Sequence, residues 1–346
     1  MDNRLVKTEG HLSACSSMDS GDQSDLCFPR LANASCRKPS SDWSDGFLFS
    51  VLLSAECVLA VLLNLLVIIS ISHFRQLYTP TNLLLLSLAV SDLLVGFVVM
   101  PGEIYMRISC WFLGDIACSL WSYMTLTTTS SSVGNMVLIS VDRYVAICDP
   151  LRYNVKVTVK RIQLCVCLSW VTSLLYCAIL LKDQLGHPGM YNSCRGECVI
   201  GLEVYAGILD IVISFVLPLS IIITLYTRVF VVAVTQARAM RSHVQCVKLQ
   251  HSAPFRAKSS ELKAARTLGA LVLVFLVCFC PYYIVILMGG NENLGSLTKY
   301  VVDLYGFNSC LNPLIYALFY PWFRKAVKQI ISLRIVQRAS CEANIL

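Results

Sequence analysis

Seven long runs of apolar residues, separated by polar and basic stretches, follow one another along this chain of 346 residues. Each is long enough to cross about 30 Å of hydrocarbon as a helix. They lie near residues 47–72, 81–101, 119–141, 163–181, 204–232, 267–288 and 299–319. Because a span in lipid must satisfy its backbone hydrogen bonds internally, each run is predicted to be helical. The pattern predicts an all-α membrane protein, a seven-transmembrane-helix bundle with a short amphipathic C-terminal helix.

The composition agrees with this prediction. Hydrophobic residues make up 56% of the chain, charged residues only 14%, and the mean hydropathy is +0.65, which leaves too little polar surface for a soluble domain of this length. We expect three segments: an extracellular tail at 1–46, a membrane domain at 47–319, and a cytoplasmic helix and tail at 320–346. No nucleic-acid partner is expected.

The charges between the apolar runs predict the orientation in the membrane. Basic residues gather in the stretches 73–75, 152–161, 228–266 and 324–328, which the positive-inside rule places in the cytoplasm. The opposite side then holds the acidic N-terminal tail, where Asn33-Ala34-Ser35 forms a sequon for N-glycosylation. These features predict a multi-pass plasma-membrane protein with an extracellular N-terminus and a glycan on Asn33.

The last apolar run carries the most specific motif of the chain. From Asn308 to Phe323 it reads Asn-Ser-Cys-Leu-Asn-Pro-Leu-Ile-Tyr-Ala-Leu-Phe-Tyr-Pro-Trp-Phe. This segment resembles the last membrane helix of rhodopsin-like G-protein-coupled receptors, and its aromatic end is similar to that of trace amine-associated receptors. The resemblance extends over essentially residues 45–330.

The resemblance implies a receptor without a cofactor that senses a small amine and acts through a heterotrimeric G protein. That G protein would be of the stimulatory or olfactory type and would raise cAMP, with arrestin and a receptor kinase as further partners. An olfactory role would place the receptor in the cilia of olfactory sensory neurons. An enzyme is not expected, because the sequence contains no His/Cys ligand cluster, nucleophile elbow or P-loop.

Several positions match the parts that move when receptors of this family are activated. By resemblance, Arg143 of the Asp142-Arg143-Tyr144 triplet pairs with Glu261 in the resting state and is released toward the G protein. The other matching positions are Tyr226, Asn312, Pro313 and Tyr316. A departure occurs at Phe279, where the family usually has tryptophan, and Phe279 is expected to fill the floor of the pocket.

The cysteines divide into those inside the apolar runs and those outside them. Cysteines inside the runs are interpreted as small packing residues. Family resemblance implies a disulfide between Cys118, at the start of the third span, and Cys198 in the second outer loop. It also implies that Cys194 pairs with a cysteine of the N-terminal tail, and the sequence leaves both Cys27 and Cys36 open as that partner.

Asp92 lies inside the second apolar run, where an ionised carboxylate costs about 3 kcal/mol at the helix centre and therefore needs a partner. The resemblance implies an allosteric sodium pocket, whose matching residues here are Asp92, Ser132, Asn308, Ser309 and Asn312. Oxygen clusters of this kind suit a hard cation. The alternative is a hydrogen-bonded structural aspartate without an ion.

The ligand-binding positions depart from the pattern of biogenic amine receptors. Those receptors carry an aspartate seven residues after the third-helix cysteine, where this chain has Thr125. They also carry a tyrosine seven residues before the proline of the seventh helix, where this chain has Gly306. Both partners of the usual amine salt bridge are therefore absent.

The fifth apolar run contains a different acid. Asp210 lies eight residues before Pro218 among apolar neighbours and shares a helix face with Ser214. An intramembrane acid marks a functional site by default, and an alkylammonium ligand would supply its charge partner. Some fish trace amine receptors resemble this arrangement, which implies an amine bound in an inverted orientation. The alternative is a structural Asp210, protonated or bonded to a hydroxyl such as Thr129 or Ser130.

Other pocket positions are expected around this acid. They comprise hydroxyls on one helix face, an apolar floor and aromatic rings for a cation: Ser122, Thr125, Thr129, Ser214, Phe279, Tyr282, Tyr283 and Tyr305. A diamine would need a second acid, for which Glu103, Asp303 and Glu203 are candidates that can also pair with nearby basic residues.

The sequence also bears on three other functions. A receptor for a non-amine small molecule is the alternative if Asp210 is structural. A retinal protein is unlike this chain because residues 300–322 contain no lysine. A membrane transporter would show internal repeats and several intramembrane charges, whereas the seven spans do not repeat.

Overall fold

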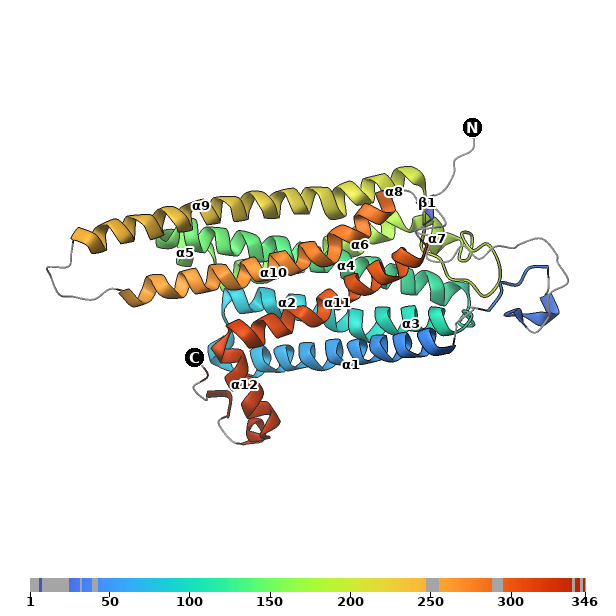
Figure 1. The fold of residues 1–346 in the computed structure, drawn as a ribbon, viewed down its shortest axis with the longest axis horizontal. Helices are drawn as coiled ribbons and strands as arrows, with labels where there is room; N and C mark the ends of the chain where they lie inside the picture. Colours follow the sequence, from blue (N-terminus) through green and yellow to red (C-terminus); the bar gives the residue numbers. More distant parts are fainter. Residues whose placement is uncertain are drawn as a thin grey trace.

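The computed structural model describes residues 6–7, 25–31, 33–38, 43–246, 255–287, 295–337, 340–342 and 345. Within these residues, seven long helical rods run along the long axis of the molecule (Figure 1). The rods are α1 (Trp43–His73), α2 (Pro80–Leu94) continued by η4 (Val95–Val99) and α3 (Met100–Ile108), α4 (Asp115–Cys148), α6 (Val159–Leu180), α8 (Val204–Asp210) continued by η5 (Ile211–Val216) and α9 (Leu217–Cys246), α10 (Phe255–Leu287) and α11 (Gly295–Phe319). The predicted all-α seven-helix bundle is confirmed.

Short elements lie at the two ends of the bundle. One end holds η2 (Pro29–Leu31), α7 (Lys182–Gly186) and the strands β1 (Val6–Lys7) and β2 (Gly201–Leu202), which pair antiparallel. The other end holds η3 (Arg75–Leu77), α5 (Pro150–Lys156), α12 (Pro321–Ile331), η7 (Arg334–Val336) and η8 (Ser340–Glu342). Seven crossings place the first and last elements of the chain at opposite ends, as Figure 1 shows.

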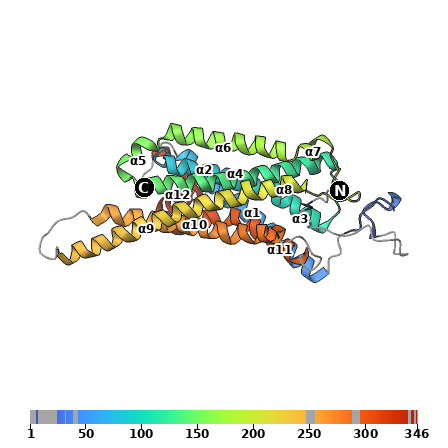
Figure 2. The same ribbon diagram turned by 90° about the horizontal axis from the view of Figure 1, so that it is seen from above.

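Several rods are longer than the apolar runs that predicted them. α1 begins at Trp43 rather than at 47, and α4 extends beyond 119–141 at both of its ends. α9 and α10 project past the other rods at the end where α5 lies (Figure 2). Hydropathy identifies only the part of a helix that is apolar enough to lie in lipid. The backbone hydrogen bonds of the helix can continue beyond that part into water.

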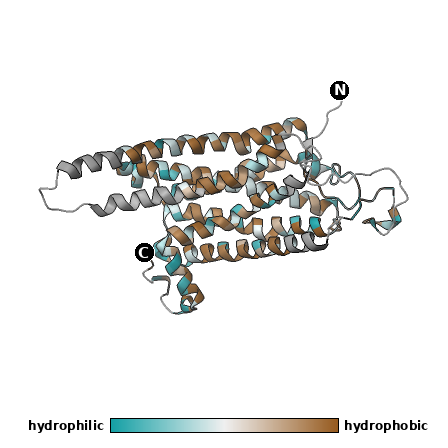
Figure 3. Ribbon diagram, in the orientation of Figure 1, coloured by the Kyte–Doolittle hydropathy of each residue, from teal (hydrophilic) through white to brown (hydrophobic). Residues whose placement is uncertain are grey.

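The rods differ in how apolar they are, although hydrophobic residues line all of them (Figure 3). Four described segments could span a membrane by length and composition alone: Ser50–His73, Pro80–Ile108, Val159–Leu180 and Val204–Val232. The most apolar window of Val159–Leu180 is only 17% buried inside the protein, so most of its surface is left for lipid. α4 packs against α2, α6 and α9, and several of its hydroxyl side chains donate to carbonyls of their own helix, including those of Ser122, Thr125 and Thr129.

Four rods contain irregular turns. η4 and η5 are π-helical, and η5 ends two residues before Pro218. α10 and α11 contain Pro281 and Pro313 in their interiors. A π-turn rotates the side chains that follow it, and a proline removes a backbone donor, so both change which residues face the bundle interior. The fifth rod consists of α8, η5 and α9, and its π-helical turn begins directly after Asp210.

α12 runs across the end of the bundle rather than along it (Figure 1). Trp322, Phe323 and Ala326 are buried, whereas Arg324 and Lys325 are exposed. One face is thus apolar and the other basic, which is the amphipathic character that the sequence predicts. A helix of this kind can lie flat at a membrane interface.

Candidate ligand-binding site

Asp210 is the last residue of α8, at the point where this helix turns into η5. Its Oδ1 accepts a hydrogen bond from the hydroxyl of Tyr176 on α6 at 2.8 Å. The same oxygen accepts a second hydrogen bond from Ser214, one turn further along the fifth rod, at 2.7 Å. Within the described residues no hydrogen bond reaches Oδ2, so one oxygen of this half-buried carboxylate is left for a ligand.

The partners of Asp210 differ from those suggested for a structural aspartate. Thr129 donates instead to a carbonyl of its own helix at 2.8 Å, and Ser130 donates to a serine of α6 at 3.2 Å. These two suggested partners are therefore wrong. Sequence reasoning missed Tyr176 because it lies on a separate helix, and nothing in the sequence reports the rotation of α6 relative to α8.

Aromatic rings from α10 and α11 gather near the fifth rod. The ring centroids of Phe279 and Tyr305 lie 4.7 Å apart, and those of Tyr282 and Tyr305 lie 5.5 Å apart. Phe215 of η5 stacks on Tyr283 at 4.2 Å. The structure thus brings the expected aromatic positions together, and the faces of such rings attract a cation.

Thr129 and Thr125 are the two hydroxyl residues of α4 that were expected near this cluster. Thr129 makes a hydroxyl–hydroxyl contact with Tyr305, which links α4 to the aromatic cluster on α11. Thr125 is half-buried and donates to the carbonyl of Trp121 at 2.9 Å, so its hydroxyl is engaged with its own helix. Neither side chain carries a charge that could replace the absent aspartate.

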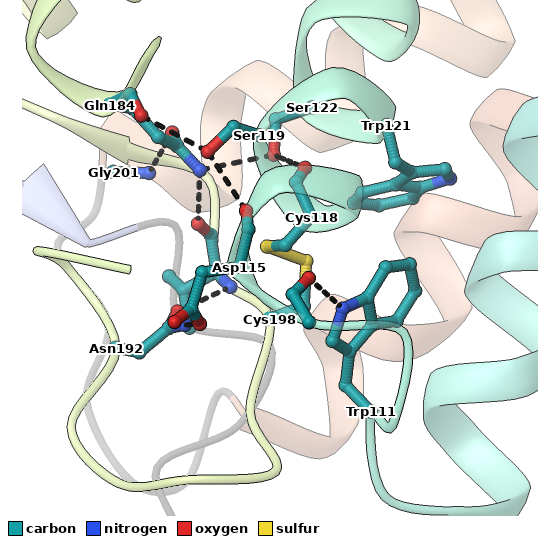
Figure 4. The surroundings of a disulfide bond; sticks show 12 residues. Trp111, Asp115, Cys118, Ser119, Trp121, Ser122, Gln184, Asn192, Cys198 and Gly201 are labelled. Atoms are coloured by element: carbon teal, nitrogen blue, oxygen red, sulfur yellow. Dashed lines mark hydrogen bonds between the residues drawn. A yellow bond between two sulfur atoms is a disulfide. The ribbon is translucent and has the colours of Figure 1, made fainter. Parts of the chain in front are cut away.

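Ser122 was expected to line the ligand site, but it anchors the loop above α4 (Figure 4). The side-chain amide of buried Gln184 on α7 donates to Ser122 at 3.2 Å and to the carbonyl of Val199 at 2.9 Å. Its Oε1 accepts from the backbone N–H of Gly201 at 3.3 Å. The disulfide Cys118–Cys198 ties the same loop to the start of α4, so covalent and polar contacts hold it together.

The N-terminal tail is held by two further disulfides. Cys36 pairs with Cys194, which decides between the two partners that the sequence left open. Cys27, the other alternative, pairs with Cys110 between α3 and α4. Sequence reasoning missed this bond, because a cysteine outside the spans can reach many partners. Asn33 is exposed in this tail, and its glycosylation stays a prediction.

The acids considered for a diamine have different surroundings. Asp303 forms an ion pair with Arg107 at 2.6 Å, so its charge is already compensated. Glu203 is exposed before α8, and Glu103 is half-buried on α3. Glu56 on α1, which sequence reasoning did not consider, has a buried Oε1 without a hydrogen bond from any described residue. A diamine ligand stays a prediction.

Asp92 is fully buried among the rods. One carboxylate oxygen accepts from Ser309 at 3.1 Å, and the other accepts from the side-chain amide of Asn312 at 2.8 Å. Ser132 donates to Ser91 at 3.0 Å, so its hydroxyl reaches the neighbour of Asp92 in the chain. These hydrogen bonds satisfy both carboxylate oxygens within the protein, and sodium binding beside them stays a prediction.

Three buried amide oxygens in this region have no hydrogen-bond partner among the described residues, those of Asn64, Asn308 and Asn312. The Asn64 amide nitrogen donates to the carbonyl of Ser309 at 2.9 Å, which keeps α1 and α11 together here. Unpartnered oxygens near a carboxylate suit a hard cation. The described residues also contain a group with metal-ligand spacing, Cys36, Cys194 and Glu197, but its two sulfur atoms are joined in a disulfide.

At the other end of α4, Asp142 forms an ion pair with Arg143. Asp142 is buried and also accepts hydrogen bonds from Tyr153 on α5 at 2.8 Å and from Thr81 on α2 at 3.0 Å. This network joins three helices and holds the arginine against α4. The side chain of Glu261 lies outside the described residues, so its pairing with Arg143 stays a prediction.

The remaining switch positions lie in the same part of the bundle. Tyr226 and Tyr316 have buried hydroxyls without a hydrogen-bond partner among the described residues. Tyr144 is half-buried, and Pro313 lies inside α11 directly after Asn312. Buried hydroxyls without partners are costly, and the switch role of these tyrosines stays a prediction.

Comparison with known proteins agrees with this geometry. The family model of the 7 transmembrane receptor (rhodopsin family) matches residues 63–316. Trace amine-associated receptor 13c of Danio rerio is 36% identical over 94% of this chain and 97% of its own length. Trace amine-associated receptor 1 of Mus musculus is 37% identical, over 92% and 99% of the two chains. Trace amine-associated receptor 8c of Rattus norvegicus is 40% identical, over 90% and 94%.

The relatives are receptors rather than enzymes, and the family match runs from within α1 to within α11, including Asp92, Asp142 and Arg143. A family match over most of the chain is more specific than any single motif. The seven-helix fold and these matches together show that the chain belongs to the trace amine-associated receptors of the rhodopsin family.

Proposed function

We propose that this receptor senses an amine by pairing the ammonium group of the ligand with Asp210. The supporting observation is the half-buried carboxylate whose Oδ2 accepts no hydrogen bond within the described part of the chain. A carboxylate in an apolar helix is costly without a cation, and an ammonium ligand supplies that cation. The names of the relatives contain trace amines, which agrees with this class of ligand.

The amine is proposed to lie in an inverted orientation, with its charged end toward the fifth rod. Thr125 carries no charge and Gly306 carries no aromatic hydroxyl, so neither partner of the usual amine salt bridge is present. A Cβ atom at position 306 would lie 3.7 Å from Oε1 of Glu56 and 3.7 Å from Cε of Met100, so these two side chains border the position of the absent tyrosine. The apolar end of the ligand would then contact the aromatic rings of α10 and α11.

The proposed signal passes through a stimulatory or olfactory G protein and raises cAMP, with arrestin and a receptor kinase as further partners. α9 and α10 project beyond the other rods at the end that holds the Asp142–Arg143 pair, which offers a surface for such partners (Figure 2). We propose the plasma membrane as the location, with the N-terminus outside, and the cilia of olfactory sensory neurons as the specific site.

A cAMP screen in cells that express the full chain tests the proposal. The panel contains primary amines, tertiary amines, diamines and polyamines, with neutral analogues of the same shape as controls. We expect responses to amines and none to the neutral analogues. A response to a neutral molecule alone would replace the amine proposal by a non-amine ligand with a structural Asp210. Ion flux through the protein in a reconstituted bilayer would favour the alternative that it is a membrane transporter.

Asp142→Asn is expected to raise basal signalling up to about tenfold. The substitution removes the charge that holds Arg143, and a hydrogen bond to a charged group contributes about 1.5–3 kcal/mol. A change of about 1.4 kcal/mol alters the ratio of two states about tenfold, so a minor active state becomes more populated. The measurement is cAMP without added amine at equal surface expression.

Asp149→Asn is the matched control for this variant. Asp149 lies just beyond α4 and pairs with Lys156 at 2.8 Å, and the hydrogen bond from Lys156 lowers the pKa of Asp149 below its ordinary value. Exposed ion pairs of this kind contribute little. We expect unchanged basal cAMP from Asp149→Asn, and an equal rise in both variants would contradict the proposed restraint by Asp142.

We also propose that sodium binds beside Asp92 as an allosteric ion. Asp92 and the unpartnered oxygens of Asn308 and Asn312 would hold it, and the ion would supply a positive charge to the buried carboxylate. Because effector and ligand are linked reciprocally, sodium bound to the resting arrangement lowers the affinity for the amine.

Asp92→Asn is expected to abolish the effect of sodium on amine potency. Replacing choline chloride by sodium chloride at constant ionic strength should raise the half-maximal amine concentration of the unaltered receptor by about fivefold or more. In the variant the two salts should give the same value. An unaltered receptor that is insensitive to the exchange would contradict the sodium site.

A further inference from the structure

Tyr176 reaches Asp210 across the boundary between two rods. Its hydroxyl, on α6, donates to Oδ1 of Asp210 at 2.8 Å. Among the described residues, the side-chain hydrogen bonds between α6 and the fifth rod all involve Tyr176, which bonds to Asp210 and Ser214. α6 packs closely against α2 and α4, and has few contacts with α8, η5 or α9. The bond to Asp210 is therefore not a by-product of close packing between the two helices.

Both hydrogen bonds to the carboxylate fall on the same oxygen. Tyr176 and Ser214 donate to Oδ1 at 2.8 and 2.7 Å. A carboxylate oxygen has about two lone-pair sites, so two donors saturate Oδ1. The donors also come from different helices, and rotation of the carboxylate would break at least one of the two bonds. Its orientation is therefore restrained, and Oδ2 is the acceptor that is left.

We propose that Tyr176 is a positioning residue for amine binding, which fixes the Asp210 carboxylate so that the ligand ammonium bonds to Oδ2 alone. This inference rests on the proposed pairing of the amine with Asp210. A single oxygen takes one N–H of the ligand. A tertiary ammonium has only one N–H and is satisfied, whereas a primary ammonium must find acceptors for two more.

The ligand site combines aromatic rings with two threonine hydroxyls. The ring of Tyr283 contacts those of Tyr282 and Phe215, whereas Thr125 and Thr129 donate to carbonyls of α4 and can still accept a hydrogen bond from an N–H. Ring faces attract the N-methyl groups of a tertiary ammonium without requiring hydrogen bonds. The site therefore prefers tertiary amines to primary amines of the same skeleton.

Tyr176→Phe tests this role, because it removes the hydroxyl and keeps the ring. The probes are matched pairs, benzylamine with N,N-dimethylbenzylamine and hexylamine with N,N-dimethylhexylamine, measured by cAMP at equal surface receptor number. We expect the half-maximal concentration of the tertiary amine to rise about tenfold, since a hydrogen bond to a charged group is lost. The primary amine should lose less, because Oδ1 regains an acceptor site. The preference for the tertiary amine should therefore fall roughly threefold or more.

Tyr123→Phe is the matched control. Its hydroxyl also joins two helices, donating from α4 to the carbonyl of Leu174 on α6 at 3.0 Å, but it does not contact Asp210. We expect an unchanged ratio of primary to tertiary potency. Ser214→Ala removes the other donor to Oδ1 and should change the ratio in the same direction as Tyr176→Phe. It also provides the test if Tyr176→Phe fails to reach the cell surface.

Two results would overturn the inference. One is unchanged potency of both amines in Tyr176→Phe, and the other is an equal loss for both that Tyr123→Phe reproduces, which indicates a structural role. Asp210→Asn separates this inference from the proposed function. If that variant loses potency while Tyr176→Phe keeps the ratio, only the positioning role is wrong. If that variant keeps full potency, the pairing of amine and Asp210 is wrong as well.

Discussion

Asp210→Asn should raise the half-maximal amine concentration by roughly 100-fold to 1000-fold. Removing one partner of a desolvated charge pair costs about 2–5 kcal/mol, far more than at an exposed ion pair, because the other charge is left buried without compensation. Asp210 is half-buried and lies at the π-helical turn of the fifth rod, so the ammonium would lose the anion with which we propose that it pairs. The measurement is the cAMP concentration–response curve at equal surface expression.

Three further variants control this result. Asp210→Glu keeps the charge and should lose less potency, because a longer side chain misplaces the carboxylate but still pairs with the ammonium. Thr125→Ala should have a modest effect, since the Thr125 hydroxyl already donates to its own helix. Thr125→Asp in the Asp210→Asn background should recover only part of the response, because Gly306 provides no tyrosine to support the new carboxylate.

Full potency in Asp210→Asn would show that the ligand is held elsewhere. Asp303 and Glu103 would be the next acids to test. Asp303 is the weaker candidate of the two, because its ion pair with Arg107 at 2.6 Å already compensates its charge. Arg107 also acts on the charge of Glu103, but Glu103 forms no ion pair as short as that of Asp303 among the described residues, so Glu103→Gln would be the variant to measure first.

Cys118→Ser or Cys198→Ser should abolish the response to amines at the cell surface. The bond closes a segment with a sequence separation of 80, and a link of that length stabilises a fold by roughly 4–5 kcal/mol in the chain-entropy description. It also joins the loop before α8 to the start of α4, next to the contacts of Gln184 (Figure 4). The number of receptors at the cell surface and the cAMP response are measured in parallel. The comparison separates a loss of export from a loss of signalling.

Cys27→Ser and Cys110→Ser are the matched comparison. Their bond has a sequence separation of 83, so chain entropy alone predicts a similar loss. The two bonds join different segments. Cys27–Cys110 ties the N-terminal tail to the segment between α3 and α4, whereas Cys118–Cys198 ties the loop before α8 to the start of α4. We expect most of the amine response to persist without it. Equal loss in both pairs would show that general stability, not the position of the loop, is responsible.

Part of the site could be predicted from sequence because its signals are local. An acid in an apolar run can be seen in the sequence, which is why Asp210 and Asp92 were predicted to be functional, although Glu56 in the first run was overlooked. The motif from Asn308 to Phe323 and the Asp142-Arg143-Tyr144 triplet are contiguous, so they identify the family without knowledge of how the helices pack. The same holds for the absence of an acid at Thr125.

The misses share one cause, which is that they depend on contacts between distant segments. Tyr176 contacts Asp210 only because of the rotation of α6, and sequence reasoning chose Thr129 and Ser130 instead. The hydrogen bond to Ser122 from Gln184 on α7, 62 residues further along the chain, was likewise not predicted, and the ligand role of Ser122 stays a prediction. Hydropathy constrains which residues face lipid, but it leaves the partner of each interior polar group undetermined.

The sequence by itself determined the seven spans, the family and the charged residues that need partners, because burial in lipid penalises every unsatisfied polar group and so restricts where such groups occur. Only the tertiary structure decided which partner each group has. Helix rotation, the π-turn of η5 and the path of the outer loops place Tyr176 on Asp210, Cys36 on Cys194 and Cys27 on Cys110. These choices depend on the packing of all rods at once, and no single segment of the chain encodes them.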